Sequence, residues 1–264
     1  MKREMSVNGS FYPDAIDELN RYFEHFDKLE SEKNISTKAK AKVVVVPHAG
    51  YVYSGFSANL AYKVLKNSNV KNIVVIGPSH REAFNGVSLG DFSSYVTPFG
   101  EIQAQLNLAN ELKRRFGLGF FKEAHKEHST EVQFPFIKNY LPDAKLVELV
   151  YSKTDAKLVS EIIDYVLQDK DNGVIISTDL SHFYNLTDAN TLDAICVDAI
   201  EHLDIKKLHS GCEACGILGV EAMMLSAKNK SLDFSLLDYR TSADASGDSS
   251  RVVGYMSGYF YEKV

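Results

Sequence analysis

The stretch KVVVVPH (42–48) decides the fold class of this chain, together with NIVVIGPSH (72–80) and GVIISTDLSH (173–182). Uninterrupted runs of Val and Ile are typical of strands that are covered on both faces, as in α/β sheets. Ligands of open α/β sheets bind just beyond the carboxyl ends of the strands. Because His48, His80 and His182 each follow such a run, we predict that they converge on one edge of a sheet.

A histidine that follows a strand is also compatible with an ordinary loop residue whose hydrogen bonds are satisfied. Three such histidines, two of them flanked by Gly and Pro and one by Asp, favour a shared site instead. Imidazole is the commonest metal ligand and the commonest acid–base group near neutral pH. The sequence therefore predicts metal or acid–base chemistry at this edge.

Strands alternate with helices along the rest of the chain, which indicates a layered domain. The closing run RVVGYMSGYFY (251–261) alternates and is typical of an antiparallel strand. We predict an α/β fold, a single three-layer α/β/α domain over residues 1–264 with a mixed, mainly parallel central sheet. Helices are expected from about 14, 54, 103, 129, 155, 186 and 216, with 27–42 as a surface connection.

Composition narrows the classes of function. The chain has 264 residues, 45% hydrophobic and 24% charged, with a net charge of −6, which argues against a general nucleic-acid binder. No run approaches the roughly 18 apolar residues that span a bilayer, and residues 1–13 contain no apolar signal-peptide core. Three cysteines, an odd number, do not predict a disulfide framework, so we expect a cytoplasmic protein.

Two polar segments add candidate residues. Asp179 and His182 are three residues apart, so the carboxylate could bind a metal or orient an imidazole acting as general base. An N-cap of a following helix is an equally good interpretation of Asp179. In EAHKEHSTE (123–131) a charged, helix-starting loop is the default, with His125 in solvent and His128 able to point into the cleft.

The pair CEAC (212–215) suggests half a zinc site or a redox dithiol. Cys215 precedes a predicted helix start, where the helix dipole favours the thiolate, so it is a candidate soft metal ligand or nucleophile. Cys212 has no predicted role, and Cys196 is predicted to be a buried core thiol.

Taken together, seven segments of this chain resemble the Memo family, also called AmmeMemoRadiSam system protein B. They are GSFYP (9–13), PHAGYVYSG (47–55), GPSH (77–80), EHSTEVQFPF (127–136), STDLSH (177–182), ACG (214–216) and SGDSSRVVGY (246–255). The resemblance covers almost the whole chain. It implies a fold similar to that of the class III, LigB-type extradiol dioxygenases, which are non-haem iron enzymes.

Residue by residue, the resemblance implies metal ligands at His48, His80 and Cys215. It also implies that Asp179, His182 and His128 line the same pocket as candidate catalytic residues. A thiolate in place of a carboxylate ligand favours copper(I) or zinc more than a purely N/O site does, although iron(II) is the expected ion. The chain reads ILGV (217–220) after Cys215-Gly216, where the family commonly has a Gly-Pro or His-Pro step.

Two classes of function follow. The first is a metal-dependent redox enzyme, dioxygenase-like, that binds a small-molecule substrate between the metal and His182. The second is a non-catalytic metal-binding or scaffold protein with a peptide ligand, and the resemblance also suggests a radical-SAM system partner. A zinc hydrolase with Asp179 as base ranks last. Neither nucleic acid nor a membrane is expected as a partner.

Overall fold

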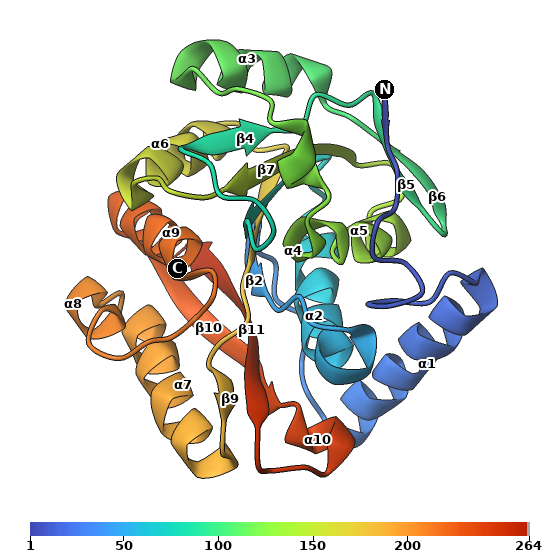
Figure 1. The fold of residues 1–264 in the computed structure, drawn as a ribbon, viewed down its shortest axis with the longest axis vertical. Coiled ribbons are helices and arrows are strands. Elements are labelled where there is room, and N and C mark those ends of the chain that lie inside the picture. Colours follow the sequence, from blue (N-terminus) through green and yellow to red (C-terminus); the bar gives the residue numbers. More distant parts are fainter. Residues whose placement is uncertain (263–264) are drawn as a thin grey trace.

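The computed structural model describes residues 1–262 and is built on one mixed sheet of eight strands (Figure 1). In spatial order its strands are β10 (Leu232–Thr241), β11 (Val252–Glu262), β2 (Val43–Val46), β8 (Asn172–Ser177), β3 (Asn72–Pro78), β7 (Lys145–Tyr151) and β4 (Val87–Leu89), and β9 (His182–Tyr184) pairs with β11 outside this order. The four central strands, β2, β8, β3 and β7, are parallel. The outer pairings are antiparallel, so the predicted mixed α/β sheet is confirmed, with its parallel part at the centre.

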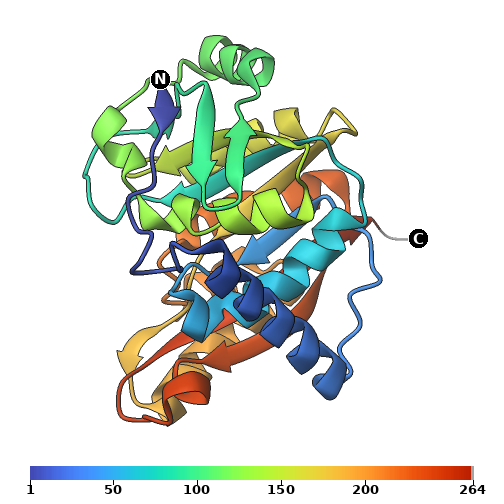
Figure 2. The same cartoon turned by 90° about the vertical axis from the view of Figure 1, so that its right-hand side faces the viewer.

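Helices cover both faces of the sheet, which gives three layers (Figures 1 and 2). One face carries α3 (Leu106–Phe116), α6 (Ala156–Val166), α7 (Leu186–Glu201), α8 (Ile205–Leu208) and α9 (Ile217–Lys230); the other carries α1 (Ile16–Lys33), α2 (Tyr51–Lys66) and α5 (Phe134–Tyr140).

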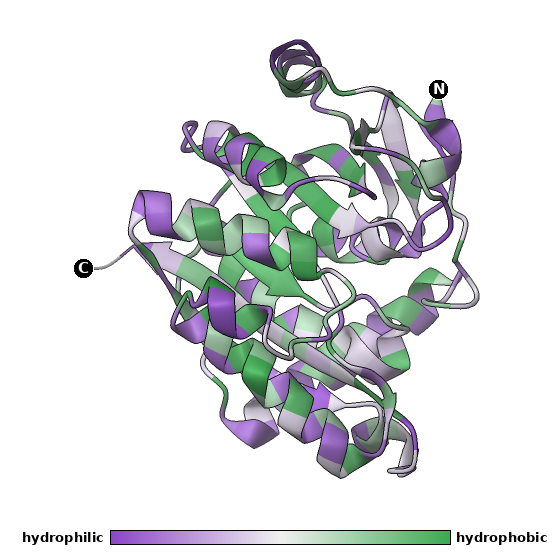
Figure 3. Cartoon of the chain, turned by 60° about the vertical axis from the view of Figure 1, so that its left-hand side comes forward, coloured by the Kyte–Doolittle hydropathy of each residue, from purple (hydrophilic) through white to green (hydrophobic). Residues whose placement is uncertain are grey.

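The side chains of β2 alternate between the two faces of the sheet, which explains why both faces are apolar. Val43 and Val45 pack into the first core, whereas Val44 and Val46 pack into the second, because successive side chains of a strand point to opposite faces. Figure 3 shows the hydrophobic strands between helices whose outer surfaces are hydrophilic. Residues 1–262 contain no helix that is both long and apolar enough to cross a membrane.

Some local predictions are wrong. The helix expected over 129–140 is two helices, α4 (His128–Glu131) and α5, and two strands between 94 and 103 were not predicted. These strands, β5 (Ser94–Thr97) and β6 (Gly100–Gln103), make a small sheet with β1 (Lys2–Arg3). The remaining short helices are η1 (Lys122–His125) and α10 (Ala243–Ser246).

A disulfide joins Cys196 of α7 to Cys212, in the segment that leads to α9, with Cα atoms 4.7 Å apart. Cys196 is buried in the core as predicted, but it is not a thiol, and Cys212 does have a role. The two cysteines are sixteen positions apart in the sequence. Cys215 is the free cysteine.

Candidate metal centre

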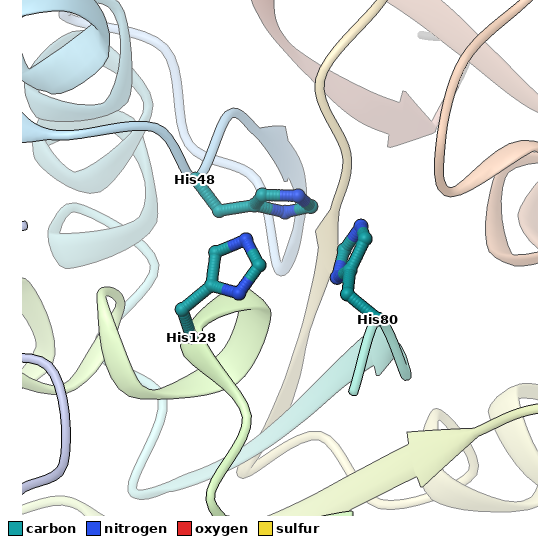
Figure 4. Close-up of side chains that lie close together, drawn as sticks. All are labelled: His48, His80 and His128. Carbon is teal, nitrogen blue, oxygen red and sulfur yellow. The ribbon is translucent and has the colours of Figure 1, made fainter. Parts of the chain in front are cut away.

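Three histidines from distant parts of the sequence meet at the carboxyl ends of the parallel strands (Figure 4). His48 follows β2, His80 follows β3 and His128 begins α4. Their ring centroids lie 5.2 Å apart for His48 and His80, 5.3 Å for His48 and His128, and 4.6 Å for His80 and His128. One ligand atom of each lies within 4.8 Å of the other two. The cluster is thus compact enough for one metal ion to contact all three rings.

The backbone at the ends of β2 and β3 fixes two of these rings. The His48 N–H donates to Asp179 Oδ1 at 2.7 Å, so β2 is tied to the segment that follows β8. Gly77, near the end of β3, lets α4 approach, because a Cβ there would lie 2.6 Å from Ser129 Oγ. Ser129 Oγ in turn donates to the Pro78 carbonyl at 2.7 Å. Close packing of α4 on β3 therefore brings His128 beside His80.

The hydrogen bonds of Ser177 determine the proton position on His48. Ser177 Oγ donates its only proton to the Ser129 carbonyl at 2.6 Å and accepts from Gln133 Nε2 at 3.1 Å. His48 Nδ1, 2.9 Å from the same oxygen, must therefore be the donor. The lone pair of neutral His48 is then on Nε2, the nitrogen that a metal would bind.

One buried carboxylate, that of Glu127, contacts the Nδ1 atoms of both His80 and His128. Glu127 Oε1 accepts from His80 Nδ1 at 3.0 Å and lies 2.8 Å from His128 Nδ1. Burial alone raises the pKa of Glu127, but hydrogen bonds from His128 and His80 outweigh it and hold the pKa far below its usual value. An ionised carboxylate only accepts, so both rings carry their proton on Nδ1 and present Nε2.

The neutral state of His48 has two physical causes. Its side chain is completely buried, and burial lowers the pKa of His48 well below its usual value because it penalises the charged form. Protonation of His80 or His128 would lower it further. A neutral imidazole is the form that binds a metal, so this environment prepares His48 as a ligand.

Cys215 contacts the cluster at His48. Its Sγ lies 3.3 Å from His48 Nε2 and accepts from the Asp179 N–H at 3.2 Å. Burial, then the negative charge of Asp179, raise the pKa of Cys215 to about 12. The predicted thiolate is therefore wrong for the metal-free protein, since burial and Asp179 outweigh the hydrogen bonds that favour the thiolate. Cys215 as a metal ligand stays a prediction.

Asp179 and His182 lie beside the cluster rather than within the group of three. Asp179 does not cap a helix: the following element is strand β9, and its carboxylate accepts from His48 instead. Burial raises the pKa of Asp179, partly offset by that hydrogen bond. His182 is half-buried on β9, and its charge is among the smaller influences that lower the pKa of His48. Their catalytic roles stay predictions.

Sequence reasoning missed the burial of the segment that carries His128. Glu127, Glu131 and His125 are all inaccessible to solvent or nearly so, and His125 pairs with Glu148 at 2.8 Å. The interpretation of His125 as solvated is therefore wrong. The only signal in the sequence was the alternation of Glu and His, and this pattern is equally common on exposed helices.

The comparisons with known proteins agree with the motifs. A family model described as "Memo-like protein" matches residues 3–259. The chain belongs to the Memo family. A "MEMO1 family protein" of Methanobrevibacter smithii is 33% identical over 98% of this chain and 100% of its own length. One of Aquifex aeolicus is 30% identical over 98% of each chain.

A solved structure has a similar fold. The crystal structure of uncharacterized protein JW3007 from Escherichia coli K12 has a TM-score of 0.55 at 11% identity, covering 83% of this chain and 99% of its own. This similarity extends to the fold alone. The predicted likeness to extradiol dioxygenases stays a prediction.

Proposed function

We propose that this Memo family protein binds one transition-metal ion, iron(II) in first place, through the Nε2 atoms of His48, His80 and His128. One observation carries the proposal: in all three rings Nδ1 is engaged by a neighbouring oxygen, so every free lone pair is on Nε2. Imidazole ligands suit iron, copper and zinc, and copper or zinc are the alternatives here.

We further propose that the ion serves redox chemistry on a small molecule. Iron(II) supplies one-electron chemistry when bound. The chain contributes His182 as the proton-transfer group and Asp179 as the carboxylate that holds the His48 backbone in place. Cys215, protonated and in contact with His48, remains outside this ligand set.

The first experiment compares ligand variants by anaerobic calorimetry with Fe(II), Cu(I) and Zn(II). His48→Ala, His80→Ala and His128→Ala should each weaken binding by about 100-fold or more, beyond the usual effect of an outer-shell residue. His25→Ala, which removes an exposed histidine, is the matched control. Absence of binding by the wild-type protein would overturn the proposal.

The number of protons released on metal binding separates the three-histidine site from the set of His48, His80 and Cys215 that the family resemblance implies. Imidazole binds as a neutral group, so at pH 8 a three-histidine site releases close to no protons, whereas a Cys215 thiol must lose one to bind. Calorimetry in two buffers of different ionisation enthalpy measures this number. Release of one proton, with Cys215→Ser as damaging as His48→Ala and His128→Ala harmless, would replace His128 by Cys215 in the site.

Oxygen uptake then tests the redox step. Iron-dependent uptake with a panel of catechols, lost in His182→Ala, would support a dioxygenase-like enzyme. Metal binding without uptake for any of them would favour the alternative, a non-catalytic metal-binding or scaffold protein.

A further inference from the structure

Glu127 occupies an unusual position, because its one carboxylate contacts two of the three histidines in the cluster. Its side chain is completely buried. Oε1 lies 3.0 Å from His80 Nδ1 and 2.8 Å from His128 Nδ1, and Oε2 accepts from the His80 backbone N–H at 2.7 Å. The same Oε1 accepts from the Ser129 N–H at 3.2 Å, so Glu127 also caps α4.

We infer that Glu127 is a positioning residue that fixes the orientation and the proton position of His80 and His128 together. The inference rests on the proposed metal site, because it assigns a task to a residue beside the ligands. A carboxylate that accepts from Nδ1–H locks the ring and directs Nε2 toward the ion. Here one group does so for two ligands, so their separation depends on a single side chain.

The third histidine of the cluster does not share this acceptor. His48 takes its orientation from Ser177, a neutral hydroxyl on a different strand. Within residues 1–262, Nδ1 of His80 and Nδ1 of His128 share one acceptor, Glu127 Oε1. A glutamine at 127 must place its amide N–H groups against either the ring donor or the His80 backbone donor. It cannot accept all four hydrogen bonds that the carboxylate accepts.

Glu131 provides a matched control variant. It is a second completely buried glutamate four residues along the chain, but it contacts Arg3 at 2.9 Å and the N-terminal segment instead of a histidine. Glu131→Gln should therefore reduce stability while leaving the two rings unchanged. A change at Glu127 that merely loosened the fold would resemble this control.

The experiment measures ring nitrogen signals of the metal-free protein by two-bond ¹H–¹⁵N NMR. Wild type and Glu131→Gln should carry the proton on Nδ1 of His80 and His128, whereas Glu127→Gln should shift at least one ring toward the Nε2–H form. Metal affinity should fall about 10- to 100-fold in Glu127→Gln and stay within about threefold of wild type in Glu131→Gln.

Two results would overturn the inference. Nε2–H rings in the wild-type protein would do so without any variant, which covers the case in which Glu127→Gln fails to fold. Unchanged Nδ1–H rings together with unchanged metal affinity in a folded Glu127→Gln would do so as well. Failure of the metal site is distinguishable from both, because the wild-type protein would then bind no ion while its ring signals stayed as expected.

Discussion

Burial of His48 predicts a specific loss of stability in acid. Its pKa in the folded protein lies well below the usual 6.5, so below pH 6.5 the unfolded chain takes up a proton that the folded chain does not. The contribution of neutral His48 to the free energy of unfolding is therefore fully present above pH 6.5. It decreases as the pH falls, by about 1.4 kcal/mol per pH unit well below 6.5. Between pH 7.5 and 5.0 this amounts to about 2 kcal/mol.

The perturbation that tests this is His48→Asn, whose amide can still donate to Ser177. Urea unfolding at pH 7.5, 6.0 and 5.0, with a chelator present, gives the free energy of unfolding of both proteins. The wild-type protein should lose about 2 kcal/mol more than the variant over this range, whereas the exposed-site control His25→Asn should parallel the wild type. Equal pH dependence of wild type and His48→Asn would refute the reasoning.

Three further predictions concern the surroundings of the site. Arg3→Ala leaves buried Glu131 without its cation and should cost about 3–5 kcal/mol in urea unfolding, whereas Lys2→Ala, at an exposed pair, should change stability by less than about 0.5 kcal/mol. Gly77→Ala should cost about 1–3 kcal/mol and weaken zinc binding in calorimetry, because its Cβ would displace α4; unchanged affinity would contradict this packing. Reduction should expose two thiols besides Cys215 to alkylation, counted by mass spectrometry, and Cys196→Ser should cost about 3 kcal/mol; three alkylated thiols without reductant would exclude the disulfide.

Periodicity predicted the architecture because the parallel strands are buried on both faces. Such strands read as continuous Val and Ile runs, and their carboxyl ends necessarily share an edge. This is why His48 and His80 were correctly expected to meet. The family resemblance, rather than periodicity, pointed to His128. The small sheet of β1, β5 and β6 was missed because its pairing joins the chain terminus to residues about ninety positions away.

The electrostatic features could not be predicted, since they depend on contacts between distant segments. Glu127 reads as one more charge in a polar helix start, and only its burial against His80 makes it an acceptor for two rings. Cys215 precedes a helix, a position that favours a thiolate, yet burial and Asp179 reverse the direction of its pKa shift. In both cases the sequence supplied the residue type but not its surroundings.

The position of His128 finally depends on the chain terminus. Helix α4 has four residues, too few to be stable alone, so packing must hold it in place. Glu127 secures its first turn from the side of the metal site, and Glu131 secures the other side by accepting from the backbone of Ser6 at 2.7 Å and of Val7 at 2.8 Å. Because Arg3 neutralises Glu131, docking of the N-terminal segment and placement of a proposed ligand are linked through one helical turn. Loss of the whole segment 1–7, unlike the single change Glu131→Gln, should therefore alter metal affinity, although none of these residues belongs to the histidine cluster.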